Sequence, residues 1–140
     1  MAKNKILVVD DDEAIRKSLQ DALVSEGFDV ITANDGEQGL ASALDQNPSL
    51  ILTDLEMPVL DGMEMLKKLR ASGDWGKNVP VIILTNFDTS EKIMQGIVEH
   101  EPSFYFLKSK VTPDTIIETI KDKLGRSESN EYNDEALFFN

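Results

Sequence analysis

Short aliphatic runs alternate with longer segments of helical periodicity, and this alternation restricts the fold more than any other feature of the sequence. The runs lie at residues 6–9, 50–53, 81–85 and 104–107, and a more polar run at 28–33 is expected near a sheet edge. Runs that are apolar on both faces are typical of strands in a parallel sheet. Strands that alternate with helices predict right-handed βαβ units, and therefore a doubly wound α/β fold, (βα)5, with five parallel strands.

Residues with strong end preferences mark the helices between these strands. Gly27 stands where the first helix needs a left-handed residue, and Asp35 is a suitable N-cap for the second. Further helices are expected over residues 63–69, over residues 93–98 with a cap at Thr89 or Ser90, and after Thr112-Pro113, where the proline fits the first turn.

Composition excludes several classes of protein. The chain has 140 residues, 41% of them hydrophobic, which suits one domain with its own core. It has no cysteine, so disulfide bonds and thiolate metal ligands are excluded. The formal net charge of −12 argues against a general binder of nucleic acid or anionic membranes. Because the apolar runs are too short for a membrane span or a secretory signal, we expect a cytoplasmic protein.

The last segment, residues 125–140, differs in character from the rest. It is rich in Ser, Asn and Glu, it is acidic, and it ends with the apolar run Leu137-Phe138-Phe139. Such a composition predicts either a flexible polar tail or a segment that docks through its terminal aromatic residues, since these are costly to leave in water. The sequence leaves both alternatives open.

Polar residues follow four of the predicted strands directly. They are Asp10 and Asp11 after the first strand, Asp54 after the third, Thr85 at the end of the fourth and Lys108 after the fifth. In an open α/β sheet these positions meet at one edge, where ligands bind. Adjacent carboxylates repel unless a cation lies between them, and oxygen ligands suit Mg²⁺. A carboxylate beside Mg²⁺ and an ammonium can act as a nucleophile toward phosphorus.

Four sequence elements, in this order and spacing, resemble the receiver domain of two-component response regulators. They are the runs Lys5–Asp12 and Thr53–Gly62, Thr85, and the run Tyr105–Lys108. The resemblance covers almost the whole chain and implies a receiver domain at residues 3–124. It further implies a flavodoxin-like sheet with strand order 2-1-3-4-5, of the kind found in a stand-alone, chemotaxis-regulator-like receiver.

The resemblance implies a role for each acidic position. Asp54 matches the phosphoacceptor, which takes a phosphoryl group from the histidine of a partner kinase, and it is also an expected Mg²⁺ ligand. Asp11 matches a direct Mg²⁺ ligand, and Asp10 matches the residue that holds metal-bound water. The backbone carbonyl of Glu56 would supply a further ligand.

A conformational switch is implied by the same resemblance. Lys108 would pair with one phosphoryl oxygen, Thr85 would hydrogen-bond to another, and Tyr105 would move inward when Thr85 moves. The added charge of about −1.5 to −2 would then bias the surface formed by the helix over residues 93–98, the strand at 104–107 and the last helix. The chain would not be an enzyme beyond its own phosphotransfer and autodephosphorylation.

Several residues depart from the usual pattern of the family. Asn86 replaces a small residue next to Thr85, and we expect it to slow phosphorylation by small donors; Asn86→Ala should then speed labelling by acetyl phosphate. Ser109 replaces a proline after Lys108, which puts the aim of that lysine in question. Residues 101–103 replace a small-residue turn, and Glu56 puts an acid at the pocket rim. His100, the only histidine, is expected to be a surface residue.

Two other functions fit parts of the pattern. A Mg²⁺-dependent aspartyl phosphohydrolase would use Asp10 and Asp12, but Ala14 stands where such enzymes carry Thr. A receiver-like adaptor would bind its partner without phosphorylation. Expected partners are a histidine kinase or phosphotransfer protein and a downstream protein, without direct contact to nucleic acid or membrane. A homodimer through the helix 93–98 and last-helix face is a further option.

Overall fold

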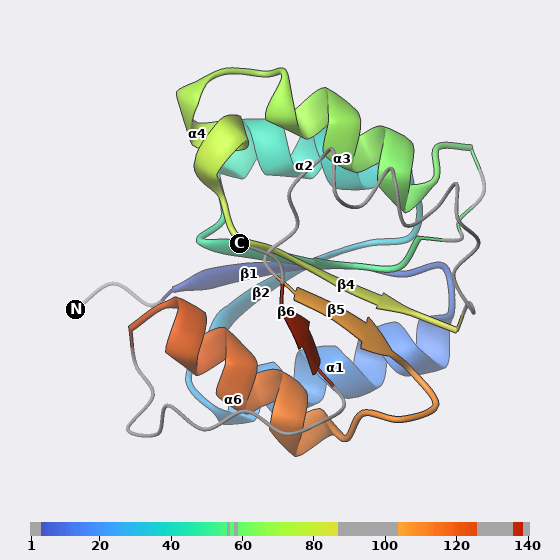
Figure 1. Cartoon of the computed structure of the whole chain (residues 1–140), viewed down its shortest axis with the longest axis vertical. Helices are drawn as coiled ribbons and strands as arrows, with labels where there is room; N and C mark the ends of the chain where they lie inside the picture. Colours follow the sequence, from blue (N-terminus) through green and yellow to red (C-terminus); the bar gives the residue numbers. More distant parts are fainter. Residues whose placement is uncertain (1–3, 56, 58, 87–103, 126–135, 139–140) are drawn as a thin grey trace.

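A computed structural model describes residues 4–55, 57, 59–86, 104–125 and 136–138. Its centre is a six-stranded sheet with the order β2-β1-β3-β4-β5-β6 (Figure 1). The strands are β1 (Lys5–Val9), β2 (Asp29–Ala33), β3 (Leu50–Thr53), β4 (Val81–Thr85), β5 (Phe104–Leu107) and β6 (Ala136–Phe138). Strands β1 to β5 pair in parallel, and β6 pairs antiparallel with β5. The parallel order 2-1-3-4-5 predicted from the sequence is confirmed, and β6 extends it by one strand.

Helices cover both faces of the sheet (Figure 1). They are α1 (Glu13–Ser25), α2 (Gly36–Gln46), α3 (Gly62–Arg70), α4 (Asp74–Asn78) and α6 (Pro113–Lys123). Helices α2, α3 and α4 lie on one face, and α1 and α6 lie on the other. None of the helices in the described part of the chain is both long and apolar enough to cross a bilayer.

Alternation along each strand divides the core into two clusters, one on each face of the sheet. In β1, Leu7 and Val9 pack in the cluster under α2 and α3, whereas Ile6 and Val8 pack in the cluster with α1 and α6. These four side chains are at most 1% exposed. Because successive side chains point to opposite faces, a strand that is apolar at every position must be covered on both sides, as the sequence predicted.

The end signals act as expected at several helices. The Asp35 and Thr112 side chains accept hydrogen bonds from backbone amides in the first turns of α2 and α6. Asp12, which was not predicted as a cap, does the same in α1. Gly27 has a φ of +91°, the left-handed conformation that a residue after a helix adopts. The short helix α4 was not expected; Trp75 on it packs against the cluster under α2 and α3. The helix predicted over residues 93–98 lies outside the described residues.

Candidate functional site

The carboxyl ends of β1 and β3 lie side by side because these strands pair in parallel. Val9 is the register partner of Thr53, so Asp10 and Asp54 occupy the next positions on adjacent chains. The backbone amide of Asp54 donates to the carbonyl of Val9 at 3.0 Å, and the amide of Asp10 donates to Ala33 at 3.2 Å. Both aspartates are thus fixed by backbone bonds to neighbouring strands, Asp54 to β1 and Asp10 to β2.

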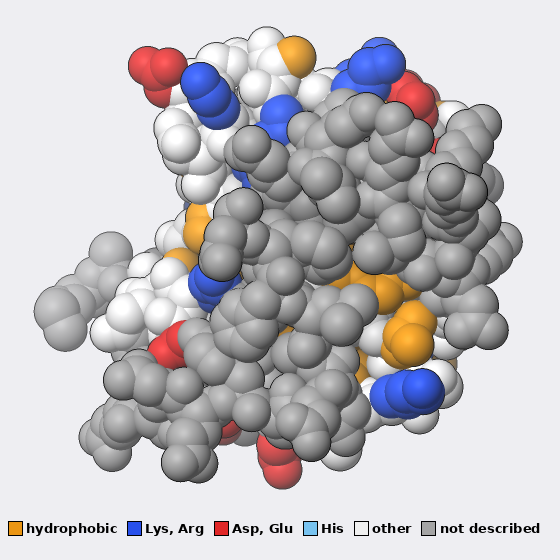
Figure 2. All heavy atoms as spheres, in the orientation of Figure 1, with side chains coloured by type: hydrophobic (Ala, Val, Ile, Leu, Met, Phe, Trp, Pro, Cys, Tyr) orange, Lys and Arg blue, Asp and Glu red, His pale blue; other side chains and the backbone are white. Residues whose placement is uncertain are grey.

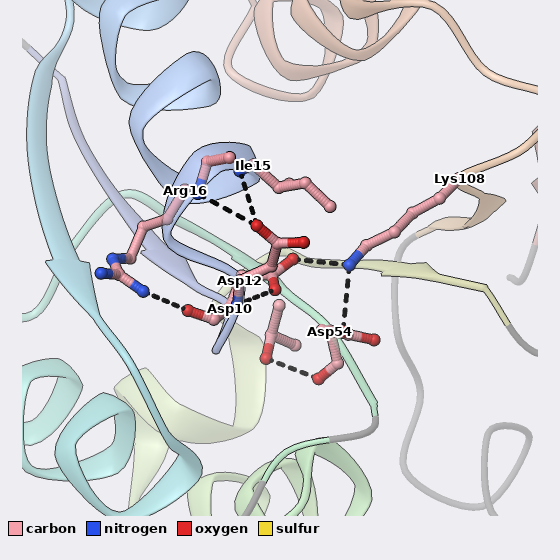
Figure 3. A network of polar contacts seen from close by, with 8 residues as sticks. Asp10, Asp12, Ile15, Arg16, Asp54 and Lys108 are labelled. Carbon is pink, nitrogen blue, oxygen red and sulfur yellow. Dashed lines mark hydrogen bonds and ion pairs between the residues drawn. The ribbon is translucent and has the colours of Figure 1, made fainter.

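Lys108 joins these two carboxylates. Its Nζ lies 2.7 Å from Oδ2 of Asp10 and 3.0 Å from Oδ2 of Asp54 (Figure 3). Its backbone amide donates to the carbonyl of Thr85 at 2.8 Å, which fixes the chain directly after β5 to the end of β4. The side chains of the three charged residues are at most 10% exposed. The replacement of proline by Ser109 therefore does not turn Lys108 away from the aspartates.

Burial perturbs the charged groups at this edge. Desolvation raises the pKa of the Asp10 carboxyl above its ordinary value, and the hydrogen bonds from Lys108 and the Asp12 amide lower it only in part. For Lys108, desolvation alone would lower the pKa of the ammonium. The hydrogen bonds and negative charges of Asp10 and Asp54 more than offset it, so that the pKa of Lys108 is raised. The carboxylates therefore keep the lysine charged.

Three carboxylates meet where one cation could bind them. Oxygens of Asp10, Asp11 and Asp54 all lie within 4.8 Å of one another, and Asp11 is exposed while the other two are buried. Oxygen-only ligands and an open side toward solvent suit Mg²⁺, which retains several of its waters. The three side chains fit this ion chemically, because a divalent cation would relieve the repulsion between their charges.

Asp12, the next residue, has a different role. Its Oδ1 accepts hydrogen bonds from the amides of Ala14 and Ile15 at 3.0 and 3.2 Å and so caps α1. Arg16, one turn into α1, donates from Nη1 to the backbone carbonyl of Asp10 at 2.8 Å (Figure 3). Arg16 was not predicted from the sequence as a functional residue. The only signal for it is its position one turn after the acidic run.

The loop after Asp54 packs tightly against its surroundings. A Cβ at Gly62 would collide with the backbone carbonyl of Asp54, and a Cβ at Gly36 would collide with the carbonyl of Leu60. Val59 in the same loop has a φ of +69°, a conformation that costs energy for a β-branched side chain, and it is 75% exposed. Glu56 and its carbonyl lie outside the described residues.

A pocket of about 320 Å³ opens over the carboxylates of Asp11, Asp12 and Asp54. Its lining residues are Asp11, Asp12, Ile15, Asp54, Met57, Asn86 and Lys108. Asn86 thus borders the pocket at which the sequence predicts that it narrows access to Asp54. Thr85 is fully buried and does not belong to this lining, although its carbonyl holds Lys108. Tyr105 is 2% exposed and packs in the cluster under α2 and α3.

A second, mostly apolar pocket of about 290 Å³ adjoins the first. Ile15 and Lys108 line both pockets. The remaining lining of the second pocket comes from α1, the end of β4 and the start of α6, namely Ala14, Ser18, Leu19, Leu84, Val111, Pro113 and Ile116. Figure 2 shows hydrophobic side chains at the surface near the ends of β4 and β5.

The same architecture occurs in solved structures. The chemotaxis response regulator CheY4 of Vibrio cholerae superposes with a TM-score of 0.77 at 30% identity, over 87% of this chain and 99% of that chain. The sequence matches the response regulator receiver domain over residues 6–121, and the chain belongs to this family. Receiver domains are components of two-component signalling, and phosphorylation and Mg²⁺ binding at an aspartate cluster are typical of them.

Two curated relatives are similar over part of the chain. A probable transcriptional regulator, ycf27 of Porphyridium aerugineum, is 44% identical over 94 residues, which are 66% of this chain and 38% of the relative. The response regulator MprA of Mycobacterium leprae is 38% identical over 93 residues, 66% of this chain and 40% of the relative. The matched part therefore spans about two fifths of the length of these relatives.

Proposed function

We propose that this receiver domain accepts a phosphoryl group on Asp54 from a phosphohistidine of a kinase or phosphotransfer protein. The observation that carries this proposal is the position of Lys108, whose Nζ contacts both Asp54 and Asp10. An ammonium held against a carboxylate in a small pocket can stabilise negative charge on a phosphoryl group arriving at that carboxylate. In this role the lysine would turn from the Asp54 oxygen to a phosphoryl oxygen.

The transfer follows from these positions. An oxygen of the Asp54 carboxylate attacks phosphorus, the bond from phosphorus to the donor's histidine nitrogen breaks, and its electron pair stays on that nitrogen. Asp10, Asp11, Asp54 and the Glu56 carbonyl would hold Mg²⁺, which neutralises charge on the phosphoryl oxygens when bound. The backbone bond from Asp54 to Val9 keeps the acceptor in place.

We further propose that phosphorylation is sensed through the chain segments that hold Lys108. Thr85 ends β4 beside it, and Tyr105 lies on the strand that leads to it. A phosphoryl group that recruits the Thr85 hydroxyl would shift the end of β4, and the packing of Tyr105 would respond. A downstream protein that prefers the shifted arrangement would then read the signal, because a ligand selects the state to which it binds more tightly.

The apolar pocket supports a protein as the phosphoryl donor. A phosphohistidine must reach the pocket at Asp54, and the adjoining surface of α1 and the start of α6 offers apolar area to the protein that carries it. Ile15 lines both pockets. It would therefore contact the donor protein and also border the pocket in which the phosphoryl group is transferred to Asp54. We infer a cytoplasmic role that depends on protein contacts, with no reaction on a separate substrate.

Two alternatives remain distinguishable by experiment. An aspartyl phosphohydrolase would need Asp12 as an acid beside Asp10, but the Asp12 carboxylate caps α1. A phosphorylation-independent adaptor would bind its partner with the carboxylates serving only as a charged surface. The adaptor predicts that no stable label forms at all.

Phosphotransfer with acetyl phosphate and with a phosphorylated histidine kinase tests the proposal. In Mg²⁺ the wild type should take up the label, and Asp54→Asn should fall to background. Asp61→Asn is the matched control, because Asp61 caps α3 through its side chain and Asn caps helices equally well. If neither acetyl phosphate nor the phosphorylated kinase labels the wild type, the adaptor is favoured.

A further inference from the structure

The outer edge of β5 is occupied by the chain's own C-terminal strand. Residues 136–138 pair antiparallel with β5, with Phe104 opposite Phe138, Tyr105 opposite Leu137 and Phe106 opposite Ala136 (Figure 1). Without β6, β5 would end the sheet and present unpaired backbone groups. Such edges are ready templates for pairing with another chain, and proteins commonly cover them.

The covering strand is the shortest strand of the described sheet and lies at its edge. It is three residues long and has a strand on one side only, whereas β5 itself also pairs with β4 over four residues. A pairing this short has few bonds to lose, and local opening costs least at such peripheral segments. The β6 pairing therefore marks a surface whose occupant can exchange.

The occupant itself shows what chemistry the edge accepts. Ala136-Leu137-Phe138 is an apolar triplet that follows Asp134 and Glu135 in the sequence. Lys110, three residues after the end of β5, is exposed, whereas the Lys108 ammonium is already held by Asp10 and Asp54. An extended apolar segment preceded by acidic residues suits this edge, since main-chain bonds give affinity in strand addition and side chains give selectivity.

We propose that the β5 edge is a strand-acceptor surface for an extended, apolar, acid-preceded segment of a partner protein. Residues 136–138 occupy this surface in the isolated chain and compete with the partner from within the same molecule. A tethered competitor acts at a high effective concentration, of order millimolar for a short flexible connection. A partner strand must therefore either bind more tightly than β6 or meet a chain in which β6 is already displaced.

The accepting strand leads directly to the candidate site. Lys108 follows the last residue of β5, and its amide is tied to Thr85 at the end of β4. Only this connection between the β5 edge and the candidate site rests on the proposed function. If that function holds, the partner would bind to the strand that leads to the phosphate-contacting lysine. The strand-acceptor proposal itself needs no phosphorylation, so the two can fail independently.

Peptide binding to the unphosphorylated full chain tests the proposal. Successive amides of a strand point to opposite sides, so one of two adjacent amides must face β5. The double variant Ala136→Pro/Leu137→Pro therefore removes an amide that donates to β5, whichever of the two residues carries it. The matched control, Ser127→Pro/Glu128→Pro, places two prolines in the same tail outside β6. The probe is a fluorescent peptide with the sequence of residues 131–140.

We expect the Ala136→Pro/Leu137→Pro variant to bind the peptide at least about tenfold more tightly than the wild type or the control. Hydrogen exchange should show faster exchange at residues 104–107 in this variant, and restored protection when the peptide is added. Exchange in β1 and β3 should stay unchanged, which shows that the fold is retained. If the variant does not fold, excess peptide added to the wild type should instead raise exchange at residues 136–138.

Three results would overturn the proposal. The first is a folded double-proline variant that does not bind the peptide. The second is equal affinity for the wild type and the double-proline variant, which would mean that β6 does not compete for the edge. The third is protection of β5 in the wild type that depends on protein concentration, which would assign the occupying strand to a second copy of the chain.

Discussion

The carboxyl end of β5 and its outer edge differ in how they are held. At the end, Lys108 is tied by its amide to Thr85 and by its Nζ to two buried aspartates. At the edge, the only described partner is the three-residue strand β6. The first arrangement is fixed by backbone and side-chain interactions from several strands, and the second includes a pairing of only three residues. One strand thus joins a rigid chemical site to an exchangeable surface.

Removal of the Lys108 ammonium should disrupt the site while the edge of β5 stays paired. For Lys108→Ala we expect the rate of phosphoryl transfer to fall by about 10²-fold, the usual loss when one charge-stabilising group is removed. Labelling by acetyl phosphate measures this rate. Lys110→Ala, an exposed lysine two positions on, is the control. A rate within a factor of two of the wild type would contradict the role of Lys108.

A side chain added at Gly62 should distort the loop that follows Asp54 and leave the pairing of β5 unchanged. The added methyl group of Gly62→Ala meets the Asp54 carbonyl, and we expect a loss of about 1–3 kcal/mol in the free energy of unfolding. Denaturant unfolding measures the loss, and labelling should slow as Asp54 moves. Gly27→Ala strains a positive φ, but its methyl group meets no other atom within 4 Å. It should therefore lower the free energy of unfolding without slowing the labelling of Asp54. Equal labelling by both variants would rule out a link through Asp54.

Mg²⁺ should stabilise the site end of the sheet. At a concentration about 100 times the dissociation constant, binding adds about 2.7 kcal/mol to the free energy of unfolding. A thermal unfolding series in Mg²⁺ measures this gain. Asp11→Asn should lose most of it, whereas Asp12→Asn should retain it, because Asn still caps α1. The same loss in both variants would place the ion elsewhere.

Relief of backbone strain at Val59 should give the smallest effect. Gly adopts a positive φ freely, so Val59→Gly should raise the free energy of unfolding by about 1 kcal/mol. Asn47→Gly is the control at the other non-glycine positive φ among the described residues, where Asn already tolerates the conformation. Denaturant unfolding compares the two. A loss of stability in Val59→Gly as large as that in Asn47→Gly would show that this loop is not strained, because both variants add the same flexibility to the unfolded chain.

The predictable and unpredictable features of the molecule differ in the range of the interactions that fix them. The buried strands follow from runs apolar at every position, and the meeting of Asp10, Asp54 and Lys108 follows from their places after parallel strands. Strand β6 depends on pairing between residues some thirty positions apart, in a tail whose composition favours turns. Arg16 and the φ of Val59 likewise depend on tertiary contacts, which local patterns do not encode.

Direct location of the phosphoryl group tests the central claim. The wild type would be labelled in Mg²⁺, its acyl phosphate reduced with borohydride, and the modified residue identified by peptide mass spectrometry. We predict that the modification maps to Asp54 and is absent without a phosphoryl donor. A modification at Asp10, Asp11 or Asp61, or a labelled chain with Asp54 unmodified, would contradict the assignment of the phosphoacceptor.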